Sequence, residues 1–266
     1  SVLVILSLNW RCAVAAPVFQ LGVDNNLGFQ SVVNKTGGST ISVGDIFYGA
    51  INLQDISSGS TSWNANNVGT PLDSFTGYFV TQATSVTATT TSLGTFYSIQ
   101  FGLATTDPNG VFTSSELAAG AMMKLFTDTS TAYTSGGPVA TDIANSVDGT
   151  HWATLGFNSS GGYWTGAVSP AGFAASGSSW GGLNFITNNT GLTWDKVVDT
   201  NCSVPGGCPV DMKFVSTFSA TGGGAWQVNF NDPAVMHPVP LPAALWLLGG
   251  GLLGLGIPMR RKPLFR

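Results

Sequence analysis

Alternating apolar and polar residues form the strongest pattern in this sequence. Apolar residues recur at every second position in 47–54, 97–103 and 226–231. A period of two places these residues on one face of a strand, so the pattern predicts half-buried β-strands. Seven further segments share this character and are bounded by turn residues: 29–33, 75–83, 121–127, 151–157, 163–168, 182–187 and 212–219.

Helical pattern is scarce. Residues Thr113–Glu116 match a capping box and lead into an apolar turn, which Gly120 cuts to about two helical turns. A threonine-rich segment at 81–95 is either a polar edge strand or a linker, and its two spaced apolar residues favour the strand.

About ten short strands separated by turns predict an all-β fold. Such a pattern is typical of an antiparallel β-sandwich or jelly roll. We expect one such acidic domain at residues 17–237, between two terminal segments of different composition.

The first terminal segment has the pattern of a secretory signal. Ser1–Leu8 are mostly apolar, and Arg11 and the small-residue run Ala13–Ala16 follow. This order is typical of the apolar region and cleavage site of a signal peptide that lacks its charged N-terminal region. Residues 1–16 are therefore interpreted as a cleaved signal, with a buried first strand as the alternative.

The second terminal segment, 238–266, has three parts. A proline motif comes first, formed by Val239, Pro240, Leu241, Pro242 and Ala243. An apolar stretch to Ile257 and a basic cluster of Arg260, Arg261 and Lys262 follow. A helix over 243–257 would be about 22 Å long, which is a marginal transmembrane span. Basic residues after a span mark its cytoplasmic side, so we expect the rest of the chain outside.

This tail closely resembles the PEP-CTERM family of bacterial sorting signals, in its VPLPA variant. The resemblance covers roughly residues 239–262, and Leu241 stands where the commoner motif has glutamate. It implies processing near the proline motif by an exosortase, a membrane cysteine transpeptidase-like enzyme, in a Gram-negative, polysaccharide-producing bacterium. A plain C-terminal membrane anchor is the alternative.

Charged residues make up only 8% of the chain, against about a quarter in ordinary domains. The surface must therefore be hydrated mainly by Ser, Thr, Asn and Gly. Between Asp24 and Asp232, four lysines and no arginine accompany thirteen acids, which leaves a formal charge of −9. Such a domain repels phosphates, which excludes nucleic acid as a partner.

The two cysteines of the expected domain, Cys202 and Cys208, enclose a Pro-Gly-Gly turn. In an exported chain this spacing predicts a local disulfide, contributing roughly 2 kcal/mol at most. A metal site would need further ligands, and only His151 and His237 are available as histidines.

Catalytic patterns are weak. Gly177–Gly181 matches the G-x-S-x-G motif around Ser179, with His237 downstream, but the following residues predict a strand where a nucleophile elbow needs a helix. One glutamate, Glu116, and aspartates in turns do not suggest a glycosidase pair. The expected protein is not an enzyme.

Calcium and carbohydrate are the ligands left to consider. The fragments 24–26, 107–109 and 142–149 carry oxygen ligands without EF-hand spacing, so structural calcium is a weak alternative to ordinary turns and no cofactor is expected. Trp164, Trp180 and Trp194 are candidates for stacking on sugar rings, and core packing is the alternative for each.

The leading hypothesis is an exported cell-surface or matrix protein that is anchored transiently in the inner membrane, processed by an exosortase and associated with exopolysaccharide or biofilm. A carbohydrate-binding module is the second hypothesis, and a secreted hydrolase is the third.

Overall fold

The structure is a computed structural model that describes residues 19–38, 40–59, 61–64, 74–128, 133, 135–158, 161–169, 176–200, 202, 205–221 and 225–240. Strands account for 61% of the described residues and helices for 7%, which confirms the all-β prediction.

All ten predicted strands are present, and the threonine-rich segment 81–95 forms the end of the longest one, the turn after it and the start of the next strand. The long strands are β1 (Asn25–Lys35), β2 (Ile46–Ser58), β4 (Ser74–Thr91), β5 (Gly94–Gly102), β6 (Ala121–Asp128), β7 (Thr150–Gly156), β8 (Tyr163–Val168), β9 (Ser176–Asn188), β13 (Met212–Ala220) and β14 (Val228–Val239). Four short strands were not predicted: β3 (Thr61–Asn64), β10 (Thr193–Asp195), β11 (Val197–Asp199) and β12 (Cys208–Val210).

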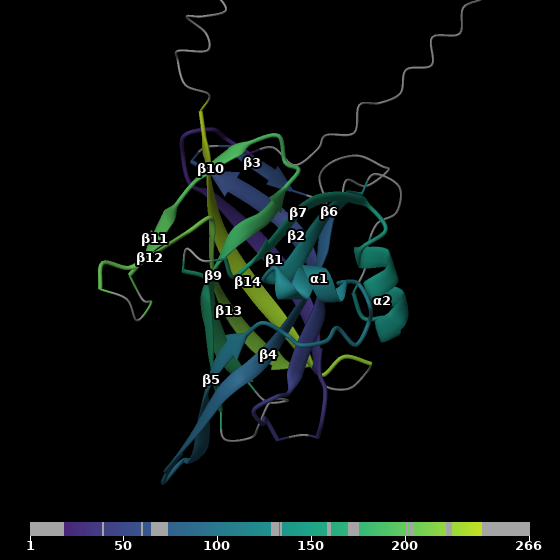
Figure 1. Cartoon of the computed structure of the whole chain (residues 1–266), viewed down its shortest axis with the longest axis vertical. Helices are drawn as coiled ribbons and strands as arrows, with labels where there is room; N and C mark the ends of the chain where they lie inside the picture. Colours follow the sequence, from purple (N-terminus) through teal and green to yellow (C-terminus); the bar gives the residue numbers. More distant parts are fainter. Residues whose placement is uncertain are drawn as a thin grey trace, which may run out of the picture.

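The main sheet closes on itself as an antiparallel eight-stranded barrel (Figure 1). Its order is β1-β14-β13-β9-β7-β6-β4-β2, and β2 pairs with β1 again. The expectation of a sandwich or jelly roll is therefore wrong. A sandwich and a barrel both bury one face of every strand, so alternation alone does not distinguish them.

Two long strands hold different partners along their length. Residues 74–79 of β4 pair with β6, and residues 82–91 pair with β5. In β9, residues 177–182 pair with β8, and residues 184–188 pair with β7. The wall between β4 and β9 is thus completed by β6 and β7 at one end and by β5 and β8 at the other.

Inside the barrel, phenylalanine rings pack over glycines. A Cβ atom on Gly177 would lie 2.2 Å from Cζ of Phe218, and one on Gly181 would lie 2.5 Å from Cζ of Phe214. Nonbonded carbons do not approach this closely, so the rings occupy the space that larger side chains would need. Glycine within these strands allows the close approach.

A second apolar cluster lies on the outer wall, where the two helices contact β2, β4 and β6 (Figure 1). The capping box predicted at Thr113–Glu116 is formed and begins α1 (Ser114–Ala118). Helix α2 (Val139–Ser146) follows Pro138 and was not predicted. Leu117 of α1 and Ile143 of α2 insert into this cluster.

The first and last described residues lie at the same end of the barrel. Gly22 N donates to the carbonyl oxygen of Pro238 at 2.8 Å. The ring of Phe19 packs edge-on against Trp194, with centroids 5.2 Å apart. Figure 1 shows the β4–β5 hairpin at the opposite end.

The structure describes no helix that is both long and apolar enough to cross a bilayer. The predicted signal (1–16), the predicted apolar helix and the basic cluster all lie outside the described residues.

Candidate functional site

The proline motif begins where the barrel ends. Val239 is the last residue of β14 and pairs with Thr193 of β10. Pro240 follows it and is exposed. The rest of the predicted sorting motif lies outside the described residues: Leu241, Pro242, Ala243, Arg260, Arg261 and Lys262.

The predicted disulfide is present. Cys202 and Cys208 are bonded, with Cα atoms 5.8 Å apart. Cys208 begins β12, which pairs with β11, and the bond closes the loop between these two strands. The disulfide and Val210 form a small buried cluster against Tyr163, which fixes this hairpin to the wall.

Two of the three candidate sugar-binding tryptophans are buried. Trp164 points into the barrel and contacts the ring of Phe214 at 4.9 Å. Trp194 stacks on Phe185 at the end of the barrel. Trp180 is half-buried on the outer face of β9. The three rings do not form a common platform.

The G-x-S-x-G match lies within the continuous strand β9. Ser179 points into the barrel and is buried, and His237 contacts Asp24 instead, at 2.9 Å. Because a nucleophile elbow requires a turn that exposes the serine, this segment does not form one.

The oxygen-rich fragments bind protein donors. Asp107 accepts hydrogen bonds from Phe112 N at 2.9 Å and from Tyr78 Oη at 2.6 Å. Asp142 is buried in α2 and accepts from Gly136 N and from Trp226 Nε1. Within the described ranges, no three His, Cys, Asp or Glu residues are grouped as metal ligands.

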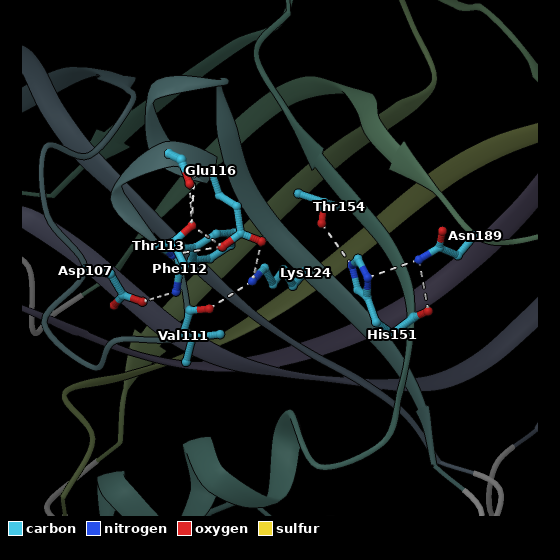
Figure 2. A network of polar contacts seen from close by, with 10 residues as sticks. Asp107, Val111, Phe112, Thr113, Glu116, Lys124, His151, Thr154 and Asn189 are labelled. Atoms are coloured by element: carbon cyan, nitrogen blue, oxygen red, sulfur yellow. Dashed lines mark hydrogen bonds and ion pairs between the residues drawn. The ribbon is translucent and has the colours of Figure 1, made fainter.

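Lys124 connects the outer wall of β6 to the segment that begins α1 (Figure 2). Its Nζ forms a 2.8 Å ion pair with Glu116, donates to the Val111 carbonyl and lies 4.8 Å from the Phe112 ring centre. Glu116 also accepts from the backbone N–H of Thr113, as the capping box requires. The lysine therefore fixes the α1 segment to the barrel.

His151 is hydrogen-bonded through both ring nitrogens (Figure 2). Asn189 Nδ2 donates to Nδ1 at 3.1 Å, and Thr154 Oγ1 lies 2.9 Å from Nε2. Since Nδ1 accepts, the ring proton is on Nε2. Burial lowers the pKa of His151, and the charge of Lys124 lowers it further. A neutral histidine engaged on both sides positions β7 and the turn after β9.

The most perturbed carboxyl group is inside the barrel. Asp232 of β14 accepts hydrogen bonds from the hydroxyls of Ser31 and Ser216, on the two neighbouring strands. Burial raises the pKa of Asp232 to about 6, although both hydroxyl contacts favour the charged form. This acid is a polar cross-link within an apolar core.

The barrel interior contains two cavities of about 30 and 20 Å³. Asp232 lines the first, and Trp164 lines both. The indole Nε1 of Trp164 and the hydroxyl of Ser179 are buried without a hydrogen-bond partner in the described part of the chain. These volumes suit one or two water molecules and are far below those of small-molecule sites. The interior is a packed core.

Comparison of the chain with known protein families, with curated proteins and with solved structures found no match.

The inward position of Asp232 was available from the sequence, because it alternates in step with Phe230 and Ala234. The partners of His151 and Lys124 were not available, since they depend on the turn after β9 and on the α1 segment. Helix α2 was also missed. For that helix, Pro138 and the four-residue spacing of Val139 and Ile143 were the missed signals.

Proposed function

We propose that this chain is an exported cell-surface protein of a polysaccharide-producing bacterium. In this proposal an N-terminal signal directs export, an exosortase processes the C-terminal tail, and the barrel has a non-enzymatic role in the extracellular matrix. The observation that carries the proposal is the three-part tail, which starts at the residue where the barrel ends.

The position of the barrel's end supports processing at this tail. Pro238 and Val239 belong to the β10–β14 pairing, whereas Pro240 is exposed. A cut on the C-terminal side of Val239 leaves β14 whole, and a cut before it removes residues that contact β10. Processing within 240–243 would therefore release an intact barrel.

The contacts of the titratable groups support a non-enzymatic role. Lys124 and His151 are engaged with protein partners, and Ser179 is buried in a strand. Because Ser179 is buried, it is a poor candidate for the nucleophile of a hydrolase. Trp164 and Trp194 are also buried, so they cannot form an exposed platform for sugar rings.

The test compares the full chain with a Pro240→Ala/Pro242→Ala variant in a host that has an exosortase. Met259→Ala is the matched control, because it changes the tail outside the motif. Intact mass and cell fractionation are measured. We expect the full chain and the control to lose the tail and leave the membrane, and the motif variant to keep residues 244–266 in the membrane fraction.

Equal masses and equal distribution for the motif variant and the full chain would contradict processing at the motif. Full retention of all three chains in the membrane would support a plain anchor instead.

A further inference from the structure

An open groove lies on the outer wall of the barrel, across β1, β14 and β13. Its volume is about 410 Å³, and a neighbouring hollow of about 230 Å³ shares Val32, Ser135 and Asn229 with it. The combined space is in the range of small-ligand sites, which is about 300–1,000 Å³. We call this space the outer groove.

Strand register places amides and hydroxyls in two rows along the outer groove. Gln30, Asn231 and Thr217 are direct cross-strand neighbours in one row. Val32, Asn229 and Ser219 form the next row. Ser135 closes one side, held near the wall because the adjacent Gly136 N–H donates to the buried Asp142.

The polar side chains of the outer groove are exposed and are not hydrogen-bonded to other described residues: Gln30, Ser135, Thr217, Ser219, Asn229 and Asn231. Some other carboxamides of the barrel are used internally. Asn34, for example, donates to the Ala225 carbonyl and accepts from Gln227 N. The amides of the outer groove thus keep their full capacity to bind a ligand.

The chemistry of the lining restricts the ligand. None of the described residues that line the groove is ionisable, so neither a phosphate nor a metal ion has a charged partner there. Strands β1, β14 and β13 are each paired on both sides, so an extended peptide has no strand edge to join. Only side chains are left to recognise the ligand, and they are amides and hydroxyls.

A polyhydroxylated, uncharged ligand matches this set. Carboxamides donate and accept at once, which suits the neighbouring hydroxyls of a sugar ring. We infer that the outer groove binds a neutral oligosaccharide segment of an extracellular polysaccharide. The inference rests on the proposed function for the source of the glycan, whereas the site itself rests on the groove.

The test uses the full chain, purified in a detergent without a sugar head group, so that sorting has no influence on the result. Maltoheptaose and cellopentaose are the neutral probes, and an oligouronate of similar length is the acidic probe. Binding is measured by saturation-transfer NMR and titration calorimetry. We expect at least one neutral probe to bind and the oligouronate to bind at least tenfold more weakly.

The variant is Thr217→Ala/Asn231→Ala, and the matched control is Ser98→Ala/Gln100→Ala, an exposed hydroxyl and amide on β5. We expect the groove variant to lose at least tenfold in affinity and the control to bind like the parent chain. Equal binding by the groove variant, preference for the oligouronate, or no binding of either neutral probe would overturn the inference.

Discussion

Asp232 makes stability depend on pH in an unusual direction. In the unfolded chain its proton leaves near the ordinary value of 3.8, whereas in the barrel the pKa is about 6. The folded state therefore binds more protons than the unfolded state between these values, and the free energy of unfolding falls as pH rises through this window. Above this pH window, ionisation of Asp232 lowers the free energy of unfolding by up to about 3 kcal/mol.

We expect Asp232→Asn to raise the free energy of unfolding at pH 7.5 by about 1–3 kcal/mol and to remove the fall between pH 4 and 6. Urea unfolding at several pH values measures both effects. Asp195→Asn, at an exposed site, is the control and should keep the fall. An unchanged pH profile in the Asp232 variant would show that this carboxyl is not responsible.

The glycine–phenylalanine contacts of the barrel lead to a second prediction. Gly177→Ala should lower the free energy of unfolding by about 1–3 kcal/mol, because the added methyl group meets the Phe218 ring. Gly38→Ala is the control, since a Cβ there meets nothing within 4 Å. Thermal unfolding measures the difference, and similar midpoints for the two variants would be inconsistent with this packing.

The β4–β5 hairpin extends beyond the closed wall (Figure 1). The last contact of β5 with β8 is between Tyr97 and Val168, and Leu93 near the tip is 80% exposed. Replacing residues 89–96 with Asn-Gly places a two-residue turn next to the Ala88–Tyr97 pair. The free energy of unfolding should change by less than about 1 kcal/mol, because this tip buries little surface.

Denaturant unfolding checks this prediction, and replacement of Ser92-Leu93 alone by Asn-Gly is the matched control. A loss well above 1 kcal/mol with the longer replacement would mean that the tip contributes to the folded barrel.

Alternation identified strands such as β5 and β13 because it reports which side chains share a face. It did not identify their neighbours, and closure of the sheet depends on neighbours, such as β2 between β1 and β4. The capping box at Thr113 was recognisable because its contacts are local. The outer groove was not, because Gln30, Asn231 and Thr217 are brought together only by long-range pairing.

The barrel also separates its two proposed functional regions. Val239 ends β14 at one end, and Asn229 lies ten residues earlier, which corresponds to about 33 Å of strand. If the tail is held in the membrane as proposed, the outer groove would lie near the far end of the barrel, within reach of the proposed polysaccharide.

The place of β14 in the sheet has a consequence for the order of events in the proposed export. This last strand lies between β1 and β13, so residues about 200 positions apart must meet before the wall closes. In the proposed export, both neighbours would keep an unpaired edge that invites misassociation until β14 has left the translocation channel. Under the proposed function, the fold is therefore completed only as the tail reaches the membrane, so a sorting enzyme would encounter a newly closed barrel and not a partly folded chain.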